Sequence, residues 1–252
     1  MNSPKTLLAF LSAVMLLSCS SDDNQNNQNN DPLTNFQSEL CTNVVGVTAG
    51  YWDSVHGIPL PLTEVPTIAN PGGQFIHSQL PLLGFQMPQG YNGFENQIGI
   101  GVNMIRNDNQ VLWRYVPSLT APSQVPVTDI LTAEINQLFA FYNFNSNFDV
   151  VCAENVSVPQ GDFIINSSSR LLRFENITMV IAVNTYFSQS LGSTFGSVAL
   201  ASGPTAEFDN LIMEVFLPIH WQLLFIDRDQ TDSDLDGVPD RLDSFPFDPE
   251  RQ

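Results

Sequence analysis

The chain has 252 residues, of which 26 are Asp or Glu and 8 are Lys or Arg, so its formal net charge is -18. Nucleic-acid binding requires a basic surface that neutralises several phosphates, so this composition excludes nucleic acid as a partner. The same charge excludes electrostatic attachment to anionic lipid headgroups.

Residues 1–18 predict a signal peptide. A short positive start at Lys5 precedes an apolar run from Leu7 to Leu17. This run is shorter than the ~20 residues that cross a bilayer, so it favours an export signal over a membrane helix.

Leu16-Leu17-Ser18-Cys19 resembles the lipobox of bacterial lipoproteins, and Ser21-Asp22-Asp23 resembles the surface-export signal of Bacteroidetes lipoproteins. The resemblance implies that Cys19 is lipidated, with palmitate-like acyl chains that anchor the protein in the outer membrane. It also implies that the protein faces the cell exterior. An uncleaved secretory signal with an incidental cysteine, and a lipoprotein that faces inward, are the alternatives.

Residues 19–37 are predicted to comprise the lipidated Cys19 and a flexible tether that follows it. They are rich in Asn, Gln, Asp and Ser, and such a segment buries too little apolar surface to offset the entropy lost on ordering. As a coil of about 18 residues the tether reaches roughly 20 to 25 Å. A β-rich domain at residues 38–226 and an acidic segment at residues 227–252 follow it.

Alternating apolar residues predict strands across this domain. Gln97–Val116 is typical of a hairpin, and Ile177–Phe187, which is apolar on both faces, is typical of a central strand. Further strands are predicted at Ser197–Ala201, Phe208–Leu217 and Trp221–Ile226.

One helix is predicted after the proline-rich Ala121–Pro126, with Thr128 or Asp129 as its N-cap. The residues that share its apolar face are Leu131, Ile135, Leu138, Phe139 and Tyr142. The predicted fold class is therefore mainly β: a β-sandwich, which can take a jelly-roll form, with one packed helix and a C-terminal calcium-binding loop.

Cys41 and Cys152 remain once Cys19 is assigned to lipid. Both lie in apolar stretches of an exported chain, which favours a disulfide. Closing a loop of about 110 residues would contribute roughly 4 kcal/mol to stability. Two buried free thiols are the alternative.

The histidines form no catalytic motif. His56, His77 and His220 have no recognisable spacing, although Asp53-Ser54-Val55-His56 brings an acid, a hydroxyl and an imidazole together. Members of a catalytic triad normally come from distant segments, so we predict that the chain is not an enzyme.

Two tryptophans have two interpretations. Trp52 and Trp113 each stand near a tyrosine, and such rings can stack on sugars in a glycan-binding site. The alternation around Trp113 favours the other interpretation, in which both rings belong to the core.

An acidic loop near the C-terminus predicts a Ca²⁺ site. Carboxylates occupy positions 1, 3, 5, 9 and 12 of a twelve-residue loop with glycine at position 6, and oxygen ligands at this spacing suit calcium. The ligands are Asp232, Asp234, Asp236, the carbonyl of Val238, Asp240 and Asp243, and Asp227 with Asp229 can form a second, partial site. A disordered acidic tail is the alternative.

The loop is similar to the thrombospondin type 3 calcium repeat, and the proline of Ser244-Phe245-Pro246 extends the likeness. That repeat has Asn-Cys-Pro at this place, so its bridging cysteine is absent here. We expect a structural ion, because the loop can saturate it and offers no histidine nearby.

These features together predict a non-catalytic, calcium-binding surface lipoprotein. The preferred role is that of an accessory or scaffold subunit of an outer-membrane protein complex, such as a β-barrel assembly, SusC/SusD-type uptake or secretion machine. The alternatives are a lipoprotein that binds glycans at the cell surface and, after it, a hydrolase.

Overall fold

The computed structural model describes residues 32–62, 66–81, 83–96, 100–224, 245, 250 and 251. They belong to the compact unit Asp31–Gln252. In chain order its elements are α1 (Val47–Ser54), β1 (Pro71–Ile76), β2 (Gly84–Pro88), β3 (Tyr91–Glu95), β4 (Ile100–Arg106), β5 (Leu112–Ala121), α2 (Val127–Phe141), β6 (Asp149–Gln160), β7 (Phe163–Phe174), β8 (Ile177–Ser188), β9 (Ser193–Pro204), α3 (Phe208–Leu211), the π-helical turn η1 (Ile212–Phe216) and α4 (Leu217–Leu224).

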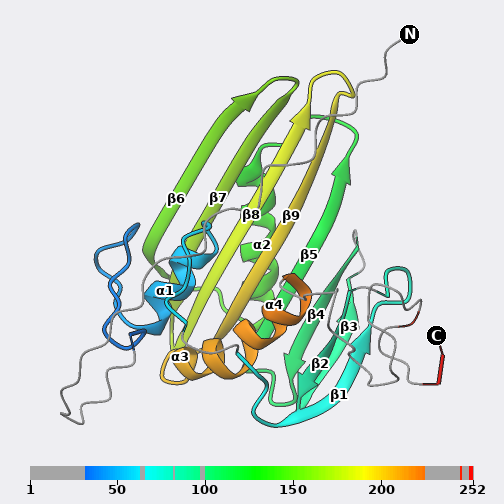
Figure 1. Cartoon of the computed structure of the whole chain (residues 1–252). Coiled ribbons are helices and arrows are strands. Elements are labelled where there is room, and N and C mark those ends of the chain that lie inside the picture. Colours follow the sequence, from blue (N-terminus) through cyan, green and yellow to red (C-terminus); the bar gives the residue numbers. More distant parts are fainter. Residues whose placement is uncertain are drawn as a thin grey trace, which may run out of the picture. The chain divides into compact units, whose positions relative to one another are not determined.

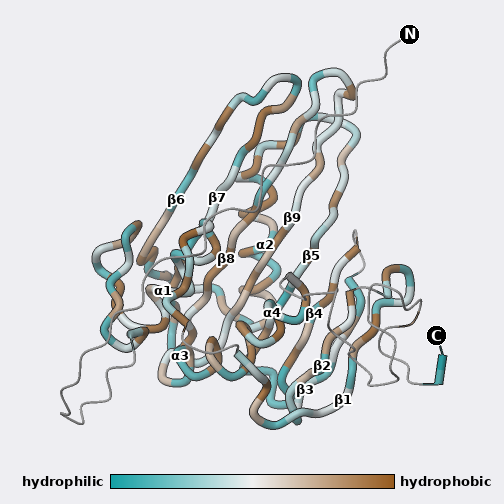
Figure 2. The backbone as a smooth tube through the Cα atoms, in the orientation of Figure 1, coloured by the Kyte–Doolittle hydropathy of each residue, from teal (hydrophilic) through white to brown (hydrophobic). Residues whose placement is uncertain are grey.

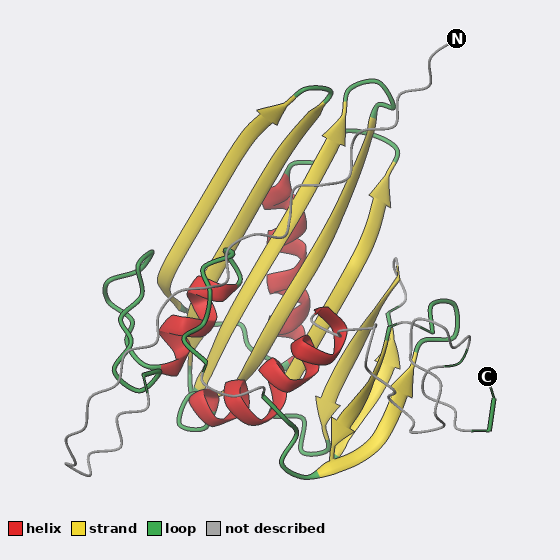
Figure 3. Ribbon diagram, in the orientation of Figure 1, coloured by secondary structure: helices red, strands yellow, loops and turns green. Residues whose placement is uncertain are grey.

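Seven strands form one antiparallel sheet in the order β3-β4-β5-β9-β8-β7-β6, and β1 pairs with β2 in a second, two-stranded sheet (Figures 1 and 3). The prediction of a mainly β fold with one packed helix is confirmed, and α2 is that helix. The predicted hairpin is β4–β5. The predicted central strand is β8, which lies between β7 and β9 and is buried on both faces from Ile177 to Val183.

The two faces of the seven-stranded sheet carry different layers. We call the face with Trp113 the front face and the face with Leu200 the back face. The registers place one buried row across the front face, made of Met104, Trp113, Ala201, Val180, Leu171 and Cys152. The β1–β2 sheet, α1 and α3–η1–α4 pack on this row, whereas α2 packs on the back face.

The long strands extend beyond the elements that cover the front face. We call the end where β9 continues into α3 the lower end, and the end with the β6–β7 and β8–β9 turns the upper end. Figure 1 shows α1 and α4 in front of the lower half and α2 behind the strands. Figure 2 shows that apolar segments of β6 and β7 continue into the upper half.

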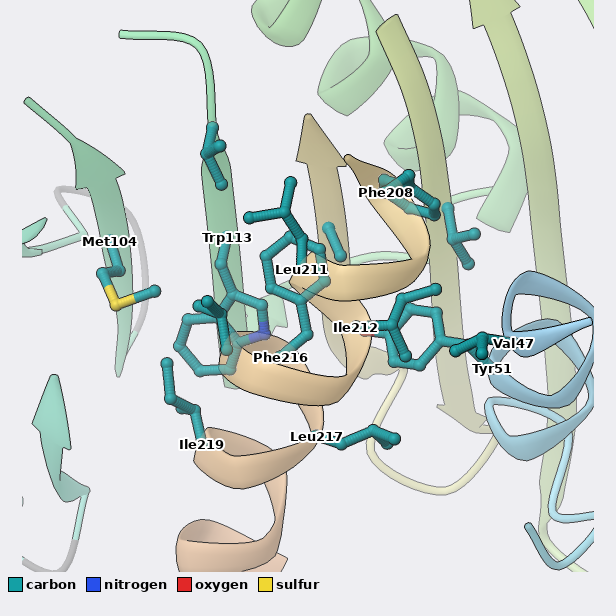
Figure 4. Packing of buried hydrophobic residues seen from close by; sticks show 14 of the residues in the cluster. Val47, Tyr51, Met104, Trp113, Phe208, Leu211, Ile212, Phe216, Leu217 and Ile219 are labelled. Carbon is teal, nitrogen blue, oxygen red and sulfur yellow. The ribbon is translucent and has the colours of Figure 1, made fainter. Parts of the chain in front are cut away.

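Residues 208–224 are helical, so the strands predicted at Phe208–Leu217 and Trp221–Ile226 are wrong. A short apolar run alone does not separate a strand from a buried helix. The buried positions have helical spacing of three and four residues, namely Phe208, Leu211, Ile212, Val215, Phe216 and Ile219. Figure 4 shows this helical face packed beside Trp113.

The start of α2 also differs from the prediction. The N-cap is Pro126, with a φ of -58°, and the helix begins at Val127 rather than after Thr128 or Asp129. Proline already has the φ that a helix start needs, so the chain turns earlier. Asp129 lies in the first turn, where a negative charge is favourable.

Candidate functional site

The two predictions that concern the ends of the chain lie outside the described residues. These are lipidation at Cys19 and the calcium ligands between Asp227 and Asp243. Of the acidic segment the structure describes Phe245, Glu250 and Arg251, and the guanidinium carbon of Arg251 lies 3.4 Å from the centre of the Phe245 ring.

The described ranges contain neither a cluster of metal ligands nor a membrane-spanning helix. Among residues 32–62, 66–81, 83–96 and 100–224, no three His, Cys, Asp or Glu side chains gather as metal ligands. Within the same ranges, no helix has the length and apolar character needed to cross a bilayer.

The structure joins Cys41 to Cys152 in a disulfide, with 6.0 Å between the Cα atoms. Cys152 lies on β6, so the bond ties the segment before α1 to the edge of the large sheet. Asp53 holds the same segment, because its carboxylate accepts hydrogen bonds from Ser38 Oγ at 2.6 Å and from the Glu39 N–H at 2.8 Å.

The acid, hydroxyl and imidazole of Asp53-Ser54-Val55-His56 do not meet. The Ser54 hydroxyl donates to the carbonyl of Tyr51, while the Asp53 carboxylate accepts its hydrogen bond from Ser38. The ring of His56 lies between the Trp52 carbonyl and Ser169 Oγ, each 2.6 Å away. These contacts attach α1 to β7, and they do not form a nucleophile with a base.

His220 of α4 lies in a cluster of aromatic rings. Its ring centre is 5.4 Å from that of Trp113, 6.1 Å from Tyr51 and 6.2 Å from Tyr115. Burial lowers the pKa of His220 to about 4. At neutral pH this imidazole is therefore uncharged and acts as one more ring of the core.

The interpretation in which Trp52 and Trp113 stack on glycans is wrong. Their side chains are 1% and 0% exposed, so neither ring can contact a sugar. Trp113 is enclosed by Phe85 and His220 on the front face, and Trp52 is buried in α1 beside His56. The favoured interpretation, in which both rings belong to the core, is confirmed.

A groove of about 510 Å³ opens on the back face between α2 and the strands β3, β4 and β5. The registers of these strands place Phe94, Asn103 and Arg114 side by side on its floor. The residues that line the groove include Phe94, Asn103, Arg114, Glu134, Gln137 and Phe141.

An ion pair between Arg114 and Glu134 lies at the bottom of this groove. Nη2 of Arg114 donates to Glu134 Oε1 at 3.0 Å, Nε lies 2.9 Å from Oε2, and Nη1 donates to Asn103 Oδ1 at 3.1 Å. Burial raises the pKa of the Glu134 carboxyl, and the charge of Arg114 acts in the opposite direction. The sequence analysis missed this pair, although Glu134 stands among the apolar residues of the helix face.

The upper half of the front face is a second candidate surface. Strand registers place Val158, Ile165, Tyr186 and Phe195 in one row, which we call the upper apolar row. Tyr186 is 42% exposed and Val158 is 48% exposed. Asp162 fixes the strand turns at this end, since its carboxylate accepts hydrogen bonds from Ser188 and Ser190 across the hairpins.

No protein-family model matches this chain, and no curated protein matches it. Among solved structures it is similar to the solution structure of cyanobacterial PsbP (CyanoP) from Synechocystis sp. PCC 6803. The identity is 10% over 62% of this chain and 92% of that one, with a TM-score of 0.29. A likeness at that level informs neither the fold nor the function.

Proposed function

We propose that the chain is a non-catalytic, calcium-binding lipoprotein on the outer face of the outer membrane, where it serves as an accessory or scaffold subunit of a protein complex. The observation that carries the proposal is the upper end of β6. There an edge strand and the upper apolar row meet on a part of the domain that the described helices leave exposed.

The edge of β6 has the properties of a protein-docking surface. The strand has 12 residues and only one neighbour, β7, so half of its backbone N–H and C=O groups face away from the sheet. Natural proteins protect such an edge with charges or proline, and residues 155–160 carry no charge and a single proline, Pro159. An extended segment of a partner can add to such an edge as a further strand.

The docking proposal is tested by affinity purification in mild detergent. The double variant Val156→Arg with Val158→Arg changes two exposed side chains of this edge, and we expect it to lose a stoichiometric outer-membrane partner. Val45→Arg is the matched control, because Val45 is 66% exposed and lies outside the sheet. Equal recovery of the partner with both variants would contradict docking at β6.

The anchor is tested by metabolic labelling with palmitate. We expect Cys19 to carry the label, and Cys19→Ser to remove both the label and membrane association. Protease added to intact cells should degrade the domain if it faces outward. An unlabelled wild-type chain would contradict the anchor.

The calcium site is tested by thermal unfolding with and without a chelator. Ligands that bind only the folded state stabilise it, so chelation should lower the Tm. Asp234→Ala with Asp236→Ala should remove this difference. A Tm that is the same with and without the chelator would contradict a structural ion.

A further inference from the structure

The floor of the back-face groove offers hydrogen-bond donors and acceptors side by side. Nη1 and Nη2 of Arg114 donate to Asn103 and Glu134 and each keeps a second N–H, while Nε is buried 2.9 Å from Glu134 Oε2. Each oxygen of Glu134 lies near one nitrogen of Arg114 and keeps a second lone pair. A ligand hydroxyl both donates and accepts, so it can satisfy the two groups together.

The walls of the groove add an aromatic surface and amides. Phe94 is 52% exposed at the edge strand β3, and Phe141 is half-buried on α2 across from it. Gln137 is exposed on α2 and Asn103 lies on the floor. Aromatic rings provide flat apolar contact area, whereas amides donate and accept hydrogen bonds. This combination suits a ligand with apolar C–H faces and many hydroxyls.

Charge argues for a neutral ligand. The positive charge of Arg114 is neutralised by Glu134 at 2.9 Å, so this pair presents no net charge to a ligand. Glu95, which also lines the groove, adds a negative charge, and its carboxylate accepts hydrogen bonds from Ser78. The chain as a whole carries -18, which repels anionic ligands. The groove volume of about 510 Å³ lies within the usual range of small-molecule sites, roughly 300 to 1,000 Å³.

We infer that this groove binds a neutral saccharide, held by the Arg114–Glu134 pair and Gln137 and stacked on Phe94. The site is separate from Trp52 and Trp113, and it lies on the opposite face from the upper apolar row. Its existence does not depend on the proposed docking at β6.

The probes are neutral hexasaccharides of glucose, xylose and mannose, with hexagalacturonate as the anionic comparison. Each is titrated into the full lipidated chain in mild detergent with calcium present, and binding is measured by calorimetry and saturation-transfer NMR. We expect at least one neutral hexasaccharide to bind and hexagalacturonate to bind at least tenfold more weakly. Phe94→Ala and Gln137→Ala should each weaken binding about tenfold, the equivalent of one lost stacking or hydrogen-bond contact.

Two control variants match the test variants. Tyr186→Ala removes an aromatic ring of comparable exposure, 42% against 52% for Phe94, from the other face, and Asn136→Ala removes the exposed amide next to Gln137. Both should bind the saccharide as the wild type does, and all four variants should keep the wild-type Tm. The inference is overturned if no neutral hexasaccharide binds, if hexagalacturonate binds as tightly, or if the test and control variants weaken binding equally. If Val156→Arg with Val158→Arg loses the protein partner but still binds the saccharide, the docking surface and the saccharide groove are independent sites.

Discussion

The lower and upper halves of the front face are built on the same long strands, but the described helices and the β1–β2 sheet cover only the lower half. Trp113 and Val180 in the lower row are 0% and 2% exposed, whereas Tyr186 and Val158 in the upper apolar row are 42% and 48% exposed. Burial in the core explains why the lower residues are apolar. It does not explain why the exposed side chains of the upper apolar row are apolar as well. Alternation along a strand therefore predicts which side chains share a face, but it does not predict whether another element covers that face.

The cover of the lower half is held by contacts between distant segments. Asp209 at the start of α3 accepts hydrogen bonds from the N–H and hydroxyl of Thr48 in α1, at 3.0 and 2.5 Å. Gln222 of α4 exchanges hydrogen bonds with the backbone of Gln86 in β2. These bonds join α1, α3–α4 and the β1–β2 sheet into one layer, and the upper half has no such layer among the described elements.

The sharpest contrast is expected from removing one aromatic ring in each half. Trp113→Ala should lower the free energy of unfolding by about 3 to 5 kcal/mol, because it leaves a cavity in the packed layer. Tyr186→Ala should cost less than about 1 kcal/mol, since its ring is already exposed. Urea unfolding measures both values, and similar costs would show that the upper half is packed as well.

The second effect concerns the disulfide between Cys41 and Cys152. Replacing both with serine should lower the free energy of unfolding by about 2 to 4 kcal/mol, since the bond closes a loop of more than 100 residues. Hydrogen exchange should accelerate in residues 37–54 and remain unchanged in β8. Faster exchange throughout the sheet would contradict a local role of the bond in fastening the cover.

The third effect is a pH dependence from His220. Above pH 6.5 the imidazole is neutral in the folded and unfolded chain, so stability is at its full value. As the pH falls toward 4, the unfolded chain binds a proton that the folded chain, with its pKa of about 4, does not bind. Stability should therefore decrease by about 3 kcal/mol between pH 7 and 4 on account of this residue.

His220→Phe keeps a ring in the cluster and should remove this part of the pH dependence. Urea unfolding of the variant and the wild type at several pH values gives the two profiles. Parallel profiles would show that His220 is already accessible to protons in the folded chain.

The smallest effect is expected at the upper turns. Asp162→Ala removes the acceptor of three hydrogen bonds from Ser188 and Ser190. Hydrogen exchange should rise in residues 160–163 and 188–193, while the urea midpoint stays at the wild-type value. A shifted midpoint would mean that the turns contribute to global stability.

Sequence reasoning succeeded where the structural signal is local. The β4–β5 hairpin has turn residues between alternating strands, and α2 has an apolar face beside a polar one, so each could be predicted from its own residues. The helices at 208–224 were missed because a nearly continuous apolar run hides their period. Their identity depends on what they pack against, which is the row that contains Trp113.

The back-face groove could not be predicted for a different reason. Arg114 and Glu134 are 20 residues apart and belong to a strand and a helix, so their contact exists only once α2 lies on the sheet. The sequence contains a partial signal, a carboxylate on the apolar side of α2. It does not contain the identity of the partner, because that depends on the order of strands.

The position of β9 in the sheet determines the order in which the domain can fold. It pairs with β5 on one side and β8 on the other, and the first of these pairs brings together Trp113 and Ala201, which are 88 positions apart in the chain. A chain that emerges from its N-terminus can form the β3–β5 and β6–β8 hairpins early, but it cannot unite them until residue 204 has emerged. Such distant pairing makes assembly slow, so both halves expose unpaired edges until the last strand arrives, and that interval is when a chaperone has the most to protect.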